Sequence, residues 1–292
     1  MASVVHTFDR FLHDIEPTDG DRAEIARRQQ LIVRRISMSL GGVRRDLLAG
    51  AYARGTAVRP LHDVDLFLVL ESTTFDHLRE QGAPACIEAI RDALLKQGPL
   101  SKERIDLIGR AVNVTISGTG IGISIVPAFE ESPGVYAIPA RDGQGWIKTD
   151  VAALERVLSR ANERAGSKLI PVIRAACHWS AQRGKPLSGL HLTALALRAI
   201  PSPPLSYPQA LRQLFAKLAD VGQRSCPDPG GVGPDLDAGL DQEQRSRIRI
   251  LFQDATRQID QALQYDRTWR SDEAHGVWRN LLGTAYPETG KR

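Results

Sequence analysis

The chain has 292 residues, a hydrophobic fraction of 42% and a charged fraction of 25%, values typical of a globular protein with one large domain or two ordinary ones. It contains no run of 18 apolar residues and its N-terminus has no signal-peptide core, so we expect a cytoplasmic protein with no membrane span. The three cysteines lack C-x-x-C spacing, which argues against zinc and a disulfide framework, and the net charge of +4 is compatible with polyanionic ligands.

The first strong element is a predicted helix over residues 22–40. Thr18 or Asp19 is placed to cap its N-terminus, and the glycine pair at 41–42 ends it. Its apolar stripe at helical spacing consists of Ile25, Ile32, Ile36 and Leu40. We interpret its paired arginines as a solvated face rather than as a nucleic-acid stripe.

Short apolar segments follow, together with one helix over residues 84–97. The predicted strands cover residues 43–48, 64–70, 105–108, 112–116 and 121–126. The glycine-containing segment 117–120 predicts a hairpin turn between the last two strands. From residue 151 onward the pattern is helical almost throughout, so the sequence predicts an α+β half with a mixed sheet, followed by an all-helical half.

The most informative segment runs from Gly50 to Phe67. A turn of small residues with Arg-Gly-Thr leads into a strand that opens Asp63-Val-Asp65. Because side chains two apart on a strand point to the same side, these two carboxylates should project together, as in a site that holds two Mg²⁺ ions. Gly50 and Gly55 let the backbone approach phosphates closely. The segment therefore predicts nucleotidyl-transfer chemistry.

At these residues the chain resembles the polymerase-β-like nucleotidyltransferases and, more narrowly, the bacterial CD-NTases, relatives of cyclic GMP–AMP synthase that make cyclic di- or trinucleotides in anti-phage defence. Further similar segments, in order, are 125–129, 136–139, 145–146, 206–208, 228–230 and 278–287. The resemblance implies a nucleotidyltransferase core with a long spine helix over residues 1–165. It also implies a helical domain over 166–292 that closes the nucleotide cleft.

The resemblance also implies the site residues. Asp63 and Asp65 would be the catalytic and metal-binding acids for Mg²⁺ or Mn²⁺, with Ser124 at the position of the third carboxylate. The positions expected to bind nucleotide are Gly50, Ala51, Arg54, Thr56, Cys177, Gly189 and Leu190. Several of them depart from the family pattern: Ala51 replaces a serine, Cys177 replaces a phosphate-binding lysine, and Gly189-Leu190 replace a hydroxyl and a stacking ring.

All these departures weaken metal or triphosphate binding, so we expect an impaired enzyme that acts by binding nucleotides or a partner in second-messenger signalling. Its expected partners are NTPs or cyclic nucleotides and an effector or regulatory protein, with nucleic acid not favoured. Two alternatives stay open: an active transferase that makes cyclic or linear oligonucleotides, and a CCA-adding type of RNA nucleotidyltransferase. Glu130 and Asp106 are the two acids that could replace the missing carboxylate. We interpret His178 and His191 as hydrogen-bonded core residues.

Overall fold

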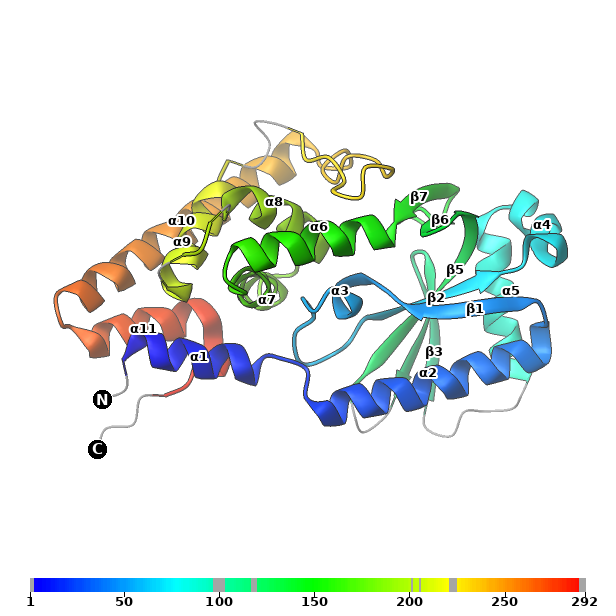
Figure 1. Cartoon of the computed structure of the whole chain (residues 1–292), viewed down its shortest axis with the longest axis horizontal. Helices are drawn as coiled ribbons and strands as arrows, with labels where there is room; N and C mark the ends of the chain where they lie inside the picture. Colours follow the sequence, from blue (N-terminus) through cyan, green and yellow to red (C-terminus); the bar gives the residue numbers. More distant parts are fainter. Residues whose placement is uncertain are drawn as a thin grey trace.

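The computed structural model describes residues 3–96, 103–116, 120–200, 202–204, 206–220 and 225–288. A sheet-containing half and a helical half lie side by side along the long axis (Figure 1). The strands are β1 Val43–Leu48, β2 Val64–Leu70, β3 Glu103–Ile108, β4 Ala111–Ile116, β5 Gly122–Ser132, β6 Val135–Pro139 and β7 Trp146–Asp150. The fold is therefore the predicted α+β arrangement of a mixed sheet followed by helices.

The helices of the sheet-containing half are α2 Asp19–Leu40, α3 Gly50–Ala53, α4 Ser72–Gln81 and α5 Ala83–Lys96. Those of the helical half are α1 Val4–Asp14, α6 Val151–Arg164, α7 Leu169–Ala181, α8 Gly189–Ala199, α9 Tyr207–Leu218, α10 Gln242–Arg267 and α11 Ser271–Leu282. Among the described residues, none of these helices is long and apolar enough to cross a membrane. The helices α1, α3 and α4 and the strands β6 and β7 have no counterpart among the predicted elements. Residues 117–119 of the predicted hairpin turn lie outside the described part of the chain.

The spine helix α2 begins at Asp19, three residues before the predicted range of 22–40, and Thr18 is its N-cap, one of the two residues predicted for that role. The Thr18 side chain accepts a hydrogen bond from the Asp21 backbone N–H, and the Asp21 carboxylate accepts one from the Thr18 N–H at 2.8 Å. This reciprocal capping box satisfies two backbone donors that a helix start leaves unpaired. The chain leaves α2 through Gly41 and Gly42, both at positive φ.

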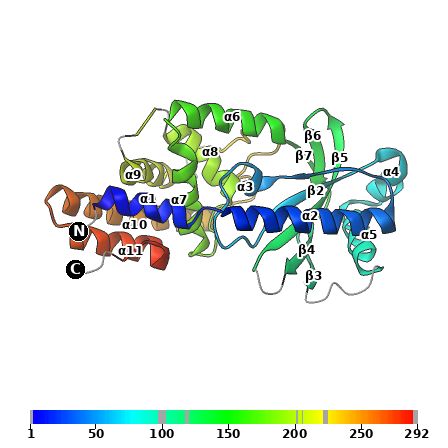
Figure 2. The same cartoon turned by 60° about the horizontal axis from the view of Figure 1, so that its bottom comes forward.

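The sheet has the strand order β1-β2-β5-β4-β3, with β6 pairing to the far part of β5 and β7 to β6. Among the strands of the described residues, β2 and β5 pair in parallel and the other neighbours pair antiparallel. Leu66, Leu68 and Ile125 are among the residues that pack on α2 and α5, which cover one face of the sheet (Figure 2). Alternation turns the odd residues of β2 and the even residues of β5 to the other face, which looks toward the helical half.

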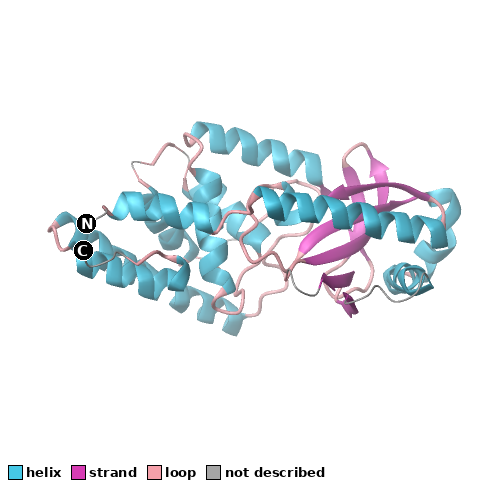
Figure 3. Ribbon diagram, turned by 90° about the horizontal axis from the view of Figure 1, so that it is seen from below, coloured by secondary structure: helices cyan, strands magenta, loops and turns pink. Residues whose placement is uncertain are grey.

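The helical half has its own apolar core. Trp179, Phe215 and Phe252 meet at its centre with ring centroids about 5 Å apart. The N-terminal helix α1 joins this core, because Phe8 packs edge-on against Trp278 at 4.6 Å between centroids. The described ends of the chain consequently lie close together at the outer end of the helical half (Figure 3). The cleft lies between this core and the open face of the sheet.

Candidate active site in the cleft between the two halves

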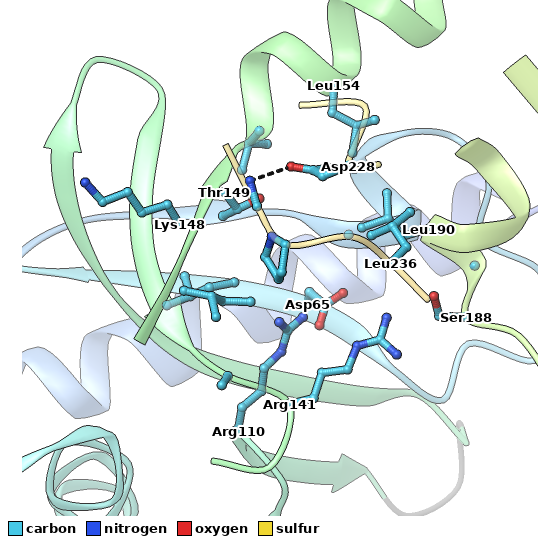
Figure 4. A pocket seen from close by; sticks show the side chains of 18 of the residues that line it. Asp65, Arg110, Arg141, Lys148, Thr149, Leu154, Ser188, Leu190, Asp228 and Leu236 are labelled. Atoms are coloured by element: carbon cyan, nitrogen blue, oxygen red, sulfur yellow. Dashed lines mark hydrogen bonds between the residues drawn. The ribbon is translucent and has the colours of Figure 1, made fainter. Parts of the chain in front are cut away.

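A cavity of about 610 Å³ lies between the sheet and the helical half. Its sheet side includes Asp65, Phe67 and Ile138, and its helical side includes Leu154 of α6 and Leu190 of α8 (Figure 4). The loop that leads to α10 contributes Asp228, Asp235, Leu236 and Leu240. The walls combine apolar side chains with five acidic and four basic ones, as in a site for a small polar molecule.

Asp65 lies at the start of β2 and faces this cavity. Burial raises the pKa of its carboxyl, while the positive charges of Arg110 and Arg54 oppose that rise. Gly50, at φ 64°, packs directly on this side chain: a Cβ at position 50 would lie 1.8 Å from Asp65 Oδ2. The glycine turn therefore serves first to make room for the Asp65 carboxylate.

Asp63 lies one residue before β2 rather than on the strand, because the regular pairing begins at Val64. Its carboxylate also lines the cavity, but it is largely exposed. Lys185, from the turn between α7 and α8, donates a hydrogen bond to Asp63 Oδ2 at 2.6 Å. The first of the two retained acids is thus ion-paired to a lysine of the helical half.

Ser124 is the register partner of Asp65 on the neighbouring parallel strand. Register partners share a face of the sheet, so its hydroxyl is on the cleft side, where it donates a hydrogen bond to Asn113 Oδ1 of β4. Ser124 is only 8% exposed. A third acid at this position would have stood directly beside Asp65.

Neither substitute acid reaches this point. Glu130 lies at the far end of β5, where it forms ion pairs with Arg44 and Arg45 of β1. Asp106 is the register partner of Asn113 on β3, two strands away from Ser124, and pairs with Arg104. At a spacing of roughly 4.8 Å between strands, its backbone is about 10 Å from that of Ser124.

The donor set does not fit a centre of two divalent ions. Among the described residues, no group of three or more His, Cys, Asp or Glu side chains could hold a metal ion. Mg²⁺ takes hard oxygen ligands, and a pair of ions requires carboxylates to bridge them. Here Asp63 is paired with Lys185, and Asp65 is flanked by arginines.

The positions expected to bind nucleotide divide into two groups. Those that line the cavity are Gly50, Ala51, Arg54, Gly189 and Leu190. Thr56 differs from the expectation: it is fully buried, and its hydroxyl donates to the Ala51 carbonyl oxygen at 3.3 Å, which fixes the turn. Cys177 lies behind Gly189, and burial raises the pKa of its thiol to about 12, so it stays a neutral thiol.

Three basic residues near Asp63 and Asp65 were not singled out from the sequence. Arg110 lies in the turn between β3 and β4, Arg141 follows β6, and both line the cavity near Asp65 (Figure 4). Burial lowers the pKa of the Arg110 guanidinium, although an arginine stays protonated at neutral pH. Lys185 is the third, and its place beside Asp63 depends on the packing of the two halves.

The two core histidines behave differently. His178 Nε2 lies 3.0 Å from the Leu282 carbonyl oxygen, as expected for a hydrogen-bonded core residue. For His191 that interpretation is wrong, because its buried Nε2 has no hydrogen-bond partner among the described residues. Burial lowers the pKa of His191 to about 4, so its ring is neutral at physiological pH.

Comparison with known proteins places this geometry in a family. Residues 1–162 match the Second Messenger Oligonucleotide or Dinucleotide Synthetase domain. The chain belongs to that family. This confirms the resemblance to the bacterial CD-NTases that the Asp63–Asp65 segment indicates.

Individual family relatives are distant. A probable cyclic nucleotide synthase of Bacillus cereus is 26% identical over 82% of this chain and 81% of its own length. A cyclic AMP-AMP-AMP synthase of Acinetobacter is 22% identical over 83% of this chain and 72% of its own length.

Solved structures agree in fold. CdnC of Escherichia coli MS115-1 with ATP matches with a TM-score of 0.73 and 18% identity, over 97% of this chain and 99% of the other. CdnG of Bradyrhizobium diazoefficiens in complex with GTP matches with a TM-score of 0.75 and 13% identity, over 96% of this chain and 95% of the other. At these identities the likeness shows the fold alone.

Proposed function

We propose that this protein is a nucleotide-binding member of the CD-NTase family with impaired nucleotidyl transfer, which acts in bacterial second-messenger signalling through a bound nucleotide or a partner protein. The observation that supports the proposal most directly is the pairing of Asp65 with Ser124. The neutral Ser124 hydroxyl, which is hydrogen-bonded to Asn113, occupies the position at which the family resemblance implies a carboxylate that activates the attacking group.

The rate loss expected from the missing carboxylate is large enough to support impairment rather than a small loss of activity. Removing one key electrostatic group from an active site typically costs about 10²–10³ in rate. Ala51 and Cys177 offer neither the hydroxyl nor the ammonium that the resemblance expects on the triphosphate. These costs need not add, but they act in the same direction.

The choice of ligand and partner rests on the family and on its solved members. Two structural neighbours were solved with ATP and with GTP, which favours an NTP or its cyclic product as the ligand of this cavity. Another solved structure is a complex of CdnC with a HORMA protein, which favours a regulatory protein as the partner.

An active enzyme with altered chemistry is the second candidate, and one observation favours it. Both Asp63 and Asp65 are retained and line the same cavity, although a site with no catalytic use has no evident need for them. The third alternative, an RNA nucleotidyltransferase of the CCA-adding type, is disfavoured by the match of residues 1–162 to the second-messenger synthetase domain.

The test is incubation of the purified protein with radiolabelled NTP mixtures and Mg²⁺ or Mn²⁺. We expect no product above background from the natural chain, and heat from NTPs or cyclic dinucleotides in a calorimetric titration. Product that disappears in Asp63→Asn would overturn impairment and establish the active alternative. Absence of heat with every nucleotide would overturn the nucleotide-binding role.

A further inference from the structure

Basic side chains of the protein act on each of the two retained carboxylates. The Lys185 ammonium lies 2.6 Å from Asp63 Oδ2. Asp65 lies in the field of Arg110 and Arg54, of which Arg110 acts more strongly. The chain itself therefore supplies some positive charge at these acids, although burial still raises the pKa of the Asp65 carboxyl.

The Asp65 charge acts on Arg110, but neither Arg110 nor Arg141 forms an ion pair with an acid of the described residues. Both line the cavity, and Figure 4 shows their side chains reaching into it on the side of Asp65. Within the described residues, neither guanidinium has a hydrogen bond or a carboxylate within 4 Å, and the two repel one another. Arg141 is exposed and Arg110 is partly buried, so both guanidinium groups can bind an anion that enters the cavity.

Two other acids of the cavity, Asp228 and Glu155, act on Arg54 rather than on these two arginines. Asp228 accepts hydrogen bonds from the Gly230 and Gly233 backbone N–H groups, and its charge acts on Arg54 rather than on Arg110. Glu155 likewise acts on Arg54. The positive charge of Arg110 and Arg141 is thus concentrated at the loops that follow β3 and β6.

Those two loops are held against each other by glycines. A Cβ at Gly109 would lie 2.9 Å from the Arg141 carbonyl oxygen, and a Cβ at Gly143 would lie 2.6 Å from the Gly109 carbonyl oxygen. Both glycines have positive φ. This close packing fixes the backbones that carry Arg110 and Arg141, so the pair is in place before a ligand binds.

We propose that Arg110 and Arg141 form a phosphate-binding site that holds a nucleotide in this cavity without a divalent cation. The planar guanidinium fork matches the oxygens of a phosphate group, and one phosphate between two arginines relieves their repulsion. The apolar wall formed by Ile138, Ile147 and Leu236 accepts the base or ribose. The inference rests on the proposed nucleotide-binding function. It adds that the phosphate is bound by the loops that carry Arg110 and Arg141 rather than by the Gly50 turn.

The experiment is isothermal titration of the purified full chain with ATP, GTP and cyclic di-AMP, each in buffer with Mg²⁺ and in buffer with EDTA. We expect binding of at least one nucleotide, with a Kd that changes less than threefold between the two buffers. Arg110→Ala and Arg141→Ala should each weaken that binding about 10- to 100-fold, as expected for the loss of charge-assisted hydrogen bonds. Comparing the NTPs with the cyclic dinucleotide identifies which phosphate source the site accepts.

The matched control is Arg104→Ala, in the same hairpin as Arg110. Arg104 is exposed, is ion-paired with Asp106 and does not line the cavity. Its Kd should not change, and thermal melting should show that all three variants are folded. Binding that requires Mg²⁺, or that survives Arg110→Ala and Arg141→Ala unchanged, would overturn the metal-free arginine site and leave the proposed function intact. Failure of every nucleotide to bind in both buffers would overturn the proposed function and this site with it.

Discussion

Asp65 and Ser124 stand side by side as register partners on the parallel strands β2 and β5, and Asn113 continues the same row on β4. The row crosses the cleft face of the sheet, so a carboxylate, a hydroxyl and a carboxamide follow one another there. The hydrogen bond from Ser124 to Asn113 makes the last two a neutral pair. Of these three side chains only Asp65 carries a negative charge, and Asp106, the next residue of the row on β3, is ion-paired with Arg104.

Restoring the acid should restore metal binding. Ser124→Asp places a second carboxylate beside Asp65 in a buried row, and we expect repulsion to destabilise the variant in EDTA. Millimolar Mg²⁺ should then raise its melting temperature, because a ligand that binds only the folded state stabilises it by about 2.7 kcal/mol at 100 times its Kd. Differential scanning fluorimetry with and without Mg²⁺ measures this.

The control for that experiment is Ser124→Asn, which is similar in size to aspartate and carries no charge. It should show no Mg²⁺-dependent shift, and neither should the natural chain. Adding Ala51→Ser to Ser124→Asp should yield product from NTPs if positions 51 and 124 limit turnover. A natural chain that Mg²⁺ stabilises as strongly as Ser124→Asp would contradict the argument.

Gly50 should be intolerant of any side chain because of its approach to Asp65. Gly50→Ala adds a Cβ 1.8 Å from Asp65 Oδ2 at a backbone φ of 64°. The comparable variant is Gly41→Ala, at φ 66° with no heavy atom within 4 Å of its Cβ. We expect Gly41→Ala to cost about 1–3 kcal/mol through backbone strain alone.

Gly50→Ala should cost about 1–3 kcal/mol more than that, since the acid must also move. Urea unfolding of both variants separates the two contributions. Equal losses would mean that the Asp65 side chain rotates away freely and that the turn does not position it.

The positions that depend on local strand geometry could be predicted from the sequence, whereas those that depend on tertiary packing could not. The run of buried strand residues indicated that Asp65 lies on one face of the sheet, because strand alternation is a local property, whereas Asp63 lies just before the strand. The register that brings Ser124 beside Asp65 was inferred from the family resemblance, and the strand pairing agrees with it. Arg110, Arg141 and Lys185 were missed, since each sits in a loop or turn whose direction depends on tertiary packing.

The ion pair between Lys185 and Asp63 should contribute little to stability and should open readily. Both side chains are more than half exposed, at 64% and 58%. Exposed pairs typically contribute about 0.2–1 kcal/mol. A double-mutant cycle with Lys185→Met and Asp63→Asn, followed by urea unfolding, should give a coupling energy in that range that shrinks at high salt. A coupling energy above about 2 kcal/mol would instead identify the pair as a fixed closure between the two halves.

His191 should make the protein lose stability in mild acid. Burial lowers its pKa to about 4 in the folded chain, whereas an unfolded histidine titrates near its ordinary value of about 6.5. The unfolded state therefore binds the proton more readily between these values. Stability is fully present above about pH 6.5 and falls as the pH drops toward 4, by an amount on the order of 3 kcal/mol.

The variant His191→Gln removes the titrating group and should flatten this part of the pH dependence, although it lowers stability at neutral pH. Urea unfolding at pH 7 and at pH 5 measures the difference for each protein. The matched variant His77→Gln replaces an exposed histidine of α4 and should leave the slope as it is in the natural chain. If unfolding free energy still falls between pH 7 and pH 5 in His191→Gln, the acid sensitivity comes from other groups. In that case His191 accepts its proton in the folded state without a loss of stability.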